Sequence, residues 1–237
     1  MILRLVPLIA GILPILTINT CYVIAVKADM VPACIPYLEG CTSVSATGRY
    51  PPASYLFRAV MLPQSVMLMV YWVLCVAWLR QFSATLGKPA NTGTAIGVLG
   101  VGGATFLILY VTFLGSQEPF YELMRRFGVY LYFGLSVIAQ LVLGFKVLPL
   151  ARSLRDRMGD PLLIRVTRLQ LALALVPFAL GVLNLVLKAT LADPDPAENM
   201  IEWIFALLMQ LYFVLTYYSW RQTGFSGSFS VALPGRD

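Results

Sequence analysis

Long apolar runs separated by short polar segments make up most of the chain. Six runs have about 20 residues, the length that an α-helix needs to cross the ~30 Å hydrocarbon core of a membrane. They predict an all-α polytopic integral membrane protein, with residues 1–221 forming one transmembrane domain and residues 222–237, which contain Gly, Ser and Pro, forming a flexible cytoplasmic tail. The predicted helices span about 3–26, 55–79, 94–114, 128–150, 163–187 and 201–218.

Composition supports lipid as the main solvent. Of the 237 residues, 59% are hydrophobic and only 12% are charged. The surface of a soluble domain of this size requires roughly a quarter of charged residues. The length leaves no room for a second globular domain beside the membrane domain.

The Lys and Arg residues are distributed unevenly between the two predicted sides. The short loop 151–161 carries Arg152, Arg155 and Arg157, and basic loops remain in the cytoplasm. The pattern predicts cytoplasmic termini and a long outer loop at about 27–54. The chain has no Asn-x-Ser/Thr glycosylation motif, which favours a bacterial inner membrane; a eukaryotic chain would lie in an endomembrane.

The chain contains no histidine. This excludes serine–histidine and cysteine–histidine catalytic pairs and histidine-containing metal sites. We predict neither a cofactor nor a metal. The net charge of +6 follows from the basic loops, which lack interleaved aromatic residues, so no nucleic-acid partner is expected. An enzyme acting on lipid would have to use Ser, Cys or carboxylate groups.

The outer loop contains two of the four cysteines, Cys34 and Cys41. On the oxidising side of the membrane a disulfide between them would close a small ring and stabilise the loop by about 2–3 kcal/mol. Two free thiols are the alternative interpretation.

The segment that begins CIPYLEGCTSVSATGRYPPASYLFR resembles the first luminal loop of the Frag1/DRAM/Sfk1 family. Matching positions combine a cysteine, prolines, serines, a glycine and a final Phe-Arg pair: Cys34, Pro36, Ser43, Ser45, Gly48, Pro52, Phe57 and Arg58. The resemblance implies six membrane helices with this loop after the first one. It also implies a role in lipid handling, because family members are tied to GPI-lipid remodelling, phosphoinositide signalling and lipid asymmetry.

Arg58 lies about one turn inside the second predicted helix, close enough to the outer interface for its side chain to reach it. A guanidinium group matches phosphate oxygens, so Arg58 and Arg49 are candidates for binding a lipid head group. The intervening segment offers further donors from Ser43, Ser45, Thr47 and Gly48. Alternatively, Arg58 pairs with an outer carboxylate (Glu202, Glu118 or Glu122) and holds the loop against the helices.

The acidic segment before the sixth helix has the spacing of a capping box. Asp195 is the expected N-cap and Glu198 the residue three positions later. Glu202 is not needed for this cap and lies at the membrane edge, which makes it the better functional candidate. In the preceding outer loop, Glu118 and Glu122 have helical spacings to Arg125 and Arg126 and predict a solvated ion-pair face.

Small residues on the third helix predict close helix packing. Gly93 and Gly97 form a GxxxG motif, and Gly100 and Ala104 a second small pair. Packing inside the bundle explains them more simply than homodimerisation. Single polar residues in the other helices predict interhelical hydrogen bonds: Asn19, Gln64, Gln140, Gln170, Asn184 and Gln210.

Two functions from different classes fit these observations. The first is a lipid-handling protein that binds a phospholipid or glycolipid head group at the outer interface and influences its remodelling or distribution. Membrane lipids are then its partners. The second is an accessory subunit that docks on other membrane protein subunits through its helices and outer loop.

Overall fold

The computed structural model of the protein describes residues 2–89 and 93–227. Most of the predicted tail, residues 228–237, lies outside this range. The described elements, in chain order, are η1 (Ile2–Leu5), α1 (Val6–Lys27), α2 (Pro36–Glu39), α3 (Val44–Thr47), α4 (Ala53–Thr85), α5 (Thr94–Phe113), α6 (Pro119–Met158), α7 (Leu162–Thr190) and α8 (Asp195–Gln222).

The all-helical fold and the six membrane-spanning helices predicted from the sequence are confirmed. The helices α4 and α6 have 33 and 40 residues, more than the roughly 20 that span a bilayer. The segment that begins at Pro119 is continuous with the fourth predicted span. The ion pairs predicted for Glu122 are present, with Arg125 and Arg126 at 3.4 and 2.7 Å, whereas no ion pair of Glu118 occurs among the described residues.

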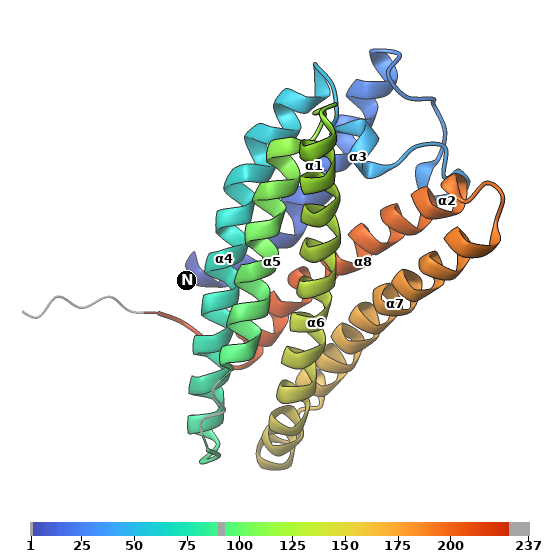
Figure 1. Cartoon of the computed structure of the whole chain (residues 1–237). Helices are drawn as coiled ribbons and strands as arrows, with labels where there is room; N and C mark the ends of the chain where they lie inside the picture. Colours follow the sequence, from blue (N-terminus) through green and yellow to red (C-terminus); the bar gives the residue numbers. More distant parts are fainter. Residues whose placement is uncertain (1, 90–92, 228–237) are drawn as a thin grey trace, which may run out of the picture.

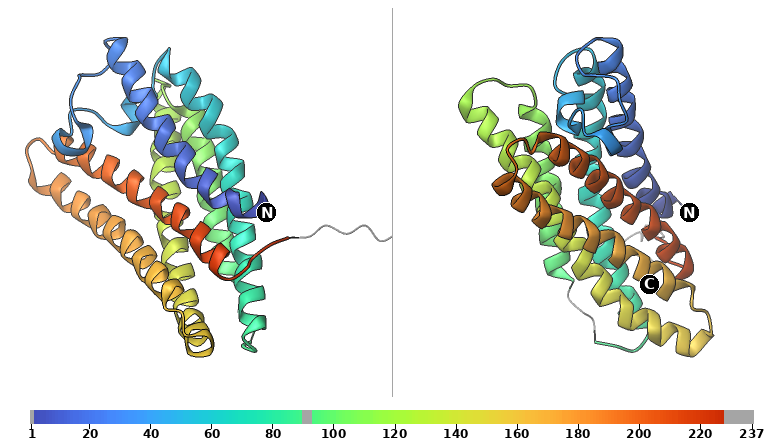
Figure 2. Two further views of the ribbon diagram at one scale, coloured as in Figure 1. Left: turned by 180° about the vertical axis from the view of Figure 1, so that it is seen from behind. Right: turned by 90° about the vertical axis from the view of Figure 1, so that its right-hand side faces the viewer.

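The six long helices form a closed ring in which each helix packs against the next one in the sequence, and α8 returns to α1 (Figure 1). The short helices α2 and α3 lie at one end of the ring, which we call the loop end. The opposite end, where α6 and α7 are joined, carries Arg152, Arg155 and Arg157 and is called the basic end. From the basic end, α7 and α8 lean away from α6 toward the loop end (Figures 1 and 2).

Aromatic side chains fill the core where α4, α5 and α8 meet. Tyr71 and Trp72 of α4 are fully buried and make edge contacts with Phe213 of α8. A Cβ atom at Gly100 would lie 2.2 Å from the Trp72 ring, so α5 approaches α4 this closely because position 100 has no side chain. Gly97 lies against Val76 of α4, whereas Gly93 precedes α5 with a φ of +53°.

Buried glutamines connect neighbouring helices through hydrogen bonds to main-chain or side-chain oxygens. Gln64 donates to the Ala10 carbonyl (2.8 Å), Gln140 to the Met209 carbonyl (3.0 Å) and Gln210 to the Tyr132 hydroxyl (3.3 Å). Each bond joins two different helices in a region without water, where polar contacts favour helix association.

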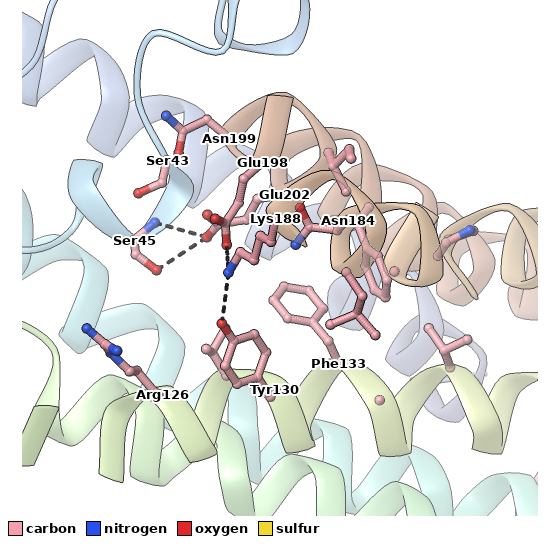
Figure 3. Close-up of a pocket in the computed structure, with 18 of the residues that line it drawn as sticks. Ser43, Ser45, Arg126, Tyr130, Phe133, Asn184, Lys188, Glu198, Asn199 and Glu202 are labelled. Carbon is pink, nitrogen blue, oxygen red and sulfur yellow. Dashed lines mark hydrogen bonds and ion pairs between the residues drawn. The ribbon is translucent and has the colours of Figure 1, made fainter. Parts of the chain in front are cut away.

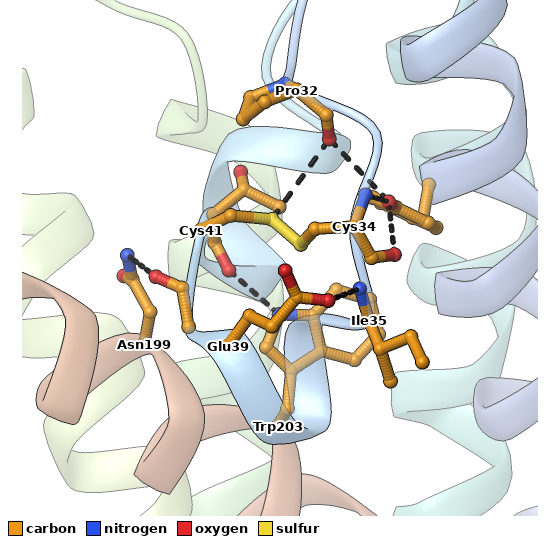
Figure 4. Close-up of a disulfide and its surroundings, with 10 residues drawn as sticks. Pro32, Cys34, Ile35, Glu39, Cys41, Asn199 and Trp203 are labelled. Atoms are coloured by element: carbon orange, nitrogen blue, oxygen red, sulfur yellow. Dashed lines mark hydrogen bonds between the residues drawn. A yellow bond between two sulfur atoms is a disulfide. The ribbon is translucent and has the colours of Figure 1, made fainter.

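The segment between α1 and α4 is folded onto the end of α8. Cys34 and Cys41 form the disulfide expected from the sequence (Figure 4). Trp203 of α8 is fully buried beneath it and donates to the Thr42 carbonyl at 2.8 Å. Gly40 ends α2 with a φ of +61°, and its carbonyl accepts from Asn199 at 2.9 Å. A Cβ at Gly40 would collide with the Pro196 carbonyl, 1.9 Å away, so this glycine permits the contact.

The predicted capping box is not present. The N-cap position of α8 is Pro194, no side chain caps the helix, and Asp195 is already its first residue. Glu198 instead pairs with Lys188 of α7 at 2.6 Å. The sequence pattern was misleading because a tertiary ion pair competes for the same carboxylate.

Candidate functional site

A cavity of about 820 Å³ lies between α6, α7 and α8, beneath the segment that contains α3 (Figure 3). Its volume falls in the range of roughly 300–1,000 Å³ typical of small-molecule sites. Along α6 the lining runs from Glu122 to Ile138, which corresponds to about 24 Å at 1.5 Å per residue. The cavity therefore extends from the loop end well into the apolar part of the helix bundle.

Charged side chains surround the loop end of the cavity. The α3–α4 segment and α6 contribute three arginines and one glutamate, namely Arg49, Arg125, Arg126 and Glu122. Helices α7 and α8 contribute one lysine and three carboxylates, namely Lys188, Asp195, Glu198 and Glu202. The wall formed by α6 and the α3–α4 segment therefore has a net charge of +2, and the wall formed by α7 and α8 has a net charge of −2. The lining as a whole is neutral.

Lys188 bridges three helices across this charged region. Its ammonium group lies 2.6 Å from Glu198 of α8 and donates to the Tyr130 hydroxyl of α6 at 3.3 Å. It also lies 5.8 Å from the centre of the Tyr130 ring. Figure 3 shows both bonds. One side chain of α7 thereby contacts both neighbouring helices at the loop end.

Glu202 is held by Ser45, which has only 8% of its surface exposed. The Ser45 main-chain N–H and its hydroxyl both donate to Oε1 of Glu202 at 3.2 Å. Because that hydroxyl proton goes to Glu202, the Tyr110 hydroxyl, 3.0 Å away, donates to the Ser45 oxygen. Within the described residues no further bond reaches Glu202, so its second oxygen, Oε2, is available to the cavity.

The remainder of the cavity is apolar. Phe133 and Val137 of α6, Phe178 and Val182 of α7 and Phe205 of α8 form its lining farther from the loop end. Phe178 and Val182 are both 51% exposed, so the cavity is continuous with the surface that faces lipid. The cavity therefore combines a charged end with an apolar interior that opens laterally.

Two lining residues have buried polar atoms without a hydrogen-bond partner in the described structure: the Nε donor of Arg49 and the Oδ1 acceptor of Asn184. An unpaired buried polar atom costs about 1–3 kcal/mol. Among the described residues, the cavity thus has an unused buried donor on one wall and an unused buried acceptor on another.

The structure brings together only part of the predicted head-group site. Arg49, Ser43, Ser45 and Glu202 line the cavity. Thr47 bonds to the Val44 carbonyl within α3, and a Cβ at Gly48 would clash with Phe57. These two residues support the loop and are not among the lining residues.

Arg58 is also outside the cavity lining. Its guanidinium donates to the Leu114 carbonyl at the end of α5. The next residue, Gly115, lies so close to the Arg49 carbonyl that a Cβ would be 2.5 Å from it. Arg58 therefore contacts a main-chain oxygen, not one of the predicted carboxylates, and supports the segment against which Arg49 packs.

Lys188, Asn184 and Tyr130 were not predicted as site residues. They lie on α6 and α7 at positions that look like ordinary interface residues, and they line one cavity with Glu198 and Glu202 only in the folded bundle. The single signal in the sequence was Asn184, a polar residue in an apolar helix. Within residues 2–89 and 93–227, no cluster of three His, Cys, Asp or Glu side chains suits a metal ion.

The fold and cavity define a polytopic helical membrane protein with a laterally open amphipathic pocket at its loop end. The model of the Frag1/DRAM/Sfk1/Cwh43P N-terminal domain matches residues 2–223, and the chain belongs to this family. No curated protein and no solved structure gives a significant match.

Proposed function

We propose that this protein binds a membrane phospholipid or glycolipid with the head group among the charged residues at the loop end, and influences the remodelling or distribution of that lipid. The observation that carries the proposal is the combination, in one cavity, of a charged end and an apolar interior continuous with the lipid-facing surface. A water-soluble ligand would make no favourable contact with the apolar interior.

Arg49 is the residue best placed to bind a phosphate. It lines the cavity and its Nε donor is buried without a partner. A guanidinium bonds phosphate oxygens in a bidentate manner. We assign Arg58 to the same site as a positioning residue, because its bond to Leu114 supports the loop that packs on Arg49.

The proposal is tested by native mass spectrometry of the protein extracted gently from its own membrane. A retained lipid is expected in the wild type. The variant Gly134→Trp should lose it, because Gly134 lines the cavity and no atom lies within 4 Å of its Cβ position. The matched control is Val98→Trp, which should retain the lipid, because Val98 of α5 is 68% exposed.

Arg58→Ala should reduce lipid retention through displacement of Arg49. If wild type and Gly134→Trp retain the same lipid in equal amount, the cavity is not the binding site. A protein partner retained in place of any lipid would support the accessory-subunit function instead.

A further inference from the structure

We infer that the head group bound in this cavity is zwitterionic and carries a primary ammonium group, as a phosphoethanolamine lipid does. The inference rests on the proposed function and names the class of lipid. It follows from how the charges are separated across the cavity, from which of them are already paired, and from the hydrogen-bonding atoms that remain.

The charges of the lining are balanced but segregated. The arginines come from α6 and the segment before α4, whereas Asp195, Glu198 and Glu202 come from α8. Figure 3 shows Arg126 on α6 and the carboxylates of Glu198 and Glu202 on α8 on different sides of the site. A head group with separate negative and positive ends matches both walls, whereas a purely anionic head group would leave the carboxylate wall without a counter-charge.

The phosphate belongs on the arginine wall. Arg125 and Arg126 are already bonded to Glu122, at 3.4 and 2.7 Å. Arg49 has no ion pair among the described residues, and its Nε is one of the buried donors without a partner. It is therefore the cation with the most unused hydrogen-bonding capacity for a phosphate.

The ammonium group belongs beside Glu202. Lys188 already neutralises Glu198 at 2.6 Å, whereas the partner of Glu202 is a neutral serine that bonds only Oε1. A charged acceptor in a region of low dielectric gains more from a cation than from a neutral donor. Glu202 thus has no ion pair among the described residues, and the ligand can supply one.

The free acceptors distinguish a primary ammonium from a quaternary one. Oε2 of Glu202 and Oδ1 of Asn184 both require N–H donors, and Oδ1 is buried without one. A primary ammonium has three N–H donors, whereas a choline group has none and is recognised chiefly by aromatic faces. Of the aromatic rings that line the cavity, that of Tyr130 already lies against Lys188, and those of Phe133, Phe178 and Phe205 belong to its apolar part. The site therefore suits ethanolamine better than choline.

The test is a competition experiment with purified protein in nanodiscs that contain equal amounts of dioleoyl phosphatidylethanolamine, phosphatidylcholine and phosphatidylglycerol. Native mass spectrometry counts the lipid that remains bound. We expect phosphatidylethanolamine to exceed each of the other two by about tenfold or more, the factor expected for one additional charge-assisted hydrogen bond.

Two variants separate the two ends of the head group. Glu202→Gln keeps an oxygen for the Ser45 bonds and removes the charge, so it should abolish the preference for ethanolamine over choline. Arg49→Gln should weaken retention of all three lipids, since all three carry a phosphate, and leave the ratio of ethanolamine to choline lipid unchanged. Glu118→Gln, an acidic position outside the cavity lining, is the control and should preserve both.

The outcomes are distinguishable. If the wild type retains lipid that Gly134→Trp loses, but shows no preference among the three head groups, the inference is overturned and the proposed function stands. Preference for phosphatidylglycerol or phosphatidylcholine in the wild type would also overturn it. Failure to retain any lipid would overturn the proposed function as well. Because the wild-type ratio alone decides the inference, the result does not depend on whether a variant folds.

Discussion

Helix α8 has polar residues in both halves, but their surroundings differ. Toward the basic end, Thr216 and Ser219 are fully buried and bonded within the bundle: Gln170 donates to Thr216 at 3.0 Å, and Ser219 donates to Gln170 at 3.3 Å. Toward the loop end, Glu198 and Glu202 face a large cavity, and Oε2 of Glu202 has no hydrogen-bond partner in the described part of the chain.

This difference separates structural from ligand-directed polarity on one helix. In lipid, a polar group whose partners belong to neighbouring helices contributes to helix association. A polar group beside an open cavity with unused hydrogen-bonding capacity is available to a ligand. Sequence position alone does not distinguish the two, because both halves present isolated polar residues in apolar surroundings. We call the tightly packed part of the bundle around Tyr71, Trp72, Gly100 and Thr216 the closed region. The residues that line the cavity are called the cavity region.

The largest effect is expected for Gly100→Ala in the closed region. The added Cβ would lie 2.2–2.6 Å from three atoms of the buried Trp72 ring. Overpacking of this kind costs about 1–3 kcal/mol and occasionally more. Thermal unfolding in detergent should show a clearly lower midpoint. Gly134→Ala is the matched control at the cavity, where no atom lies within 4 Å, and equal midpoints for the two variants would contradict the comparison.

The disulfide at the loop end should contribute a comparable amount. Replacing Cys34 and Cys41 together by serine removes the closure of a short ring, worth about 2–3 kcal/mol in the chain-entropy account. We expect a lower unfolding midpoint, and the wild type treated with a reductant should approach that of the variant. If the variant and the oxidised wild type have the same unfolding midpoint, the disulfide does not stabilise the loop.

A smaller loss is expected for Thr216→Val, which removes the shared hydroxyl partner of Gln170 and Tyr71. Both partners are buried. Gln170 keeps a longer bond to the Tyr212 carbonyl at 3.4 Å, whereas Tyr71 loses its bond to Thr216, so the loss should be about 1–2 kcal/mol. Thr105→Val is the control, since the Thr105 hydroxyl is exposed and bonds only to the main chain of its own helix. Denaturant titration of both variants measures the difference, and identical curves would contradict it.

The smallest effect on stability is expected for Lys188→Met in the cavity region. Its ion pair with Glu198 is partly exposed, with side-chain accessibilities of 35% and 29%. Such pairs contribute about 0–1 kcal/mol. The unfolding midpoint should therefore stay close to that of the wild type. A loss as large as that of Gly100→Ala would mean that the three-helix bridge is structural and that the cavity walls are as firmly packed as the closed region.

The sequence predicted the helices better than the site. Length and hydropathy determine a membrane span locally, so the six spans could be predicted. The disulfide could be predicted because Cys34 and Cys41 lie in one short outer loop. The capping box at Asp195 was wrong because Glu198 is taken by Lys188, a residue of another helix. Pairings of this kind depend on how two helices pack against each other, which the local pattern of one helix does not record.

Arg58 illustrates the same limit. Its position near the interface indicated a partner, but not whether that partner would be a lipid, a carboxylate or the Leu114 carbonyl that it contacts. Glu202 was recognised because the predicted cap left it unexplained. Asn184 and Lys188 became part of the site only when α6, α7 and α8 were placed around one cavity.

We propose above that the cavity between α6, α7 and α8 holds a lipid. A high-resolution density map of the protein in nanodiscs made from its own membrane lipids would test this directly. The account predicts elongated density with its polar end between Arg49 and Glu202 and its apolar end beside Phe178. A map in which this space contains only water, or is closed by side chains, would contradict it.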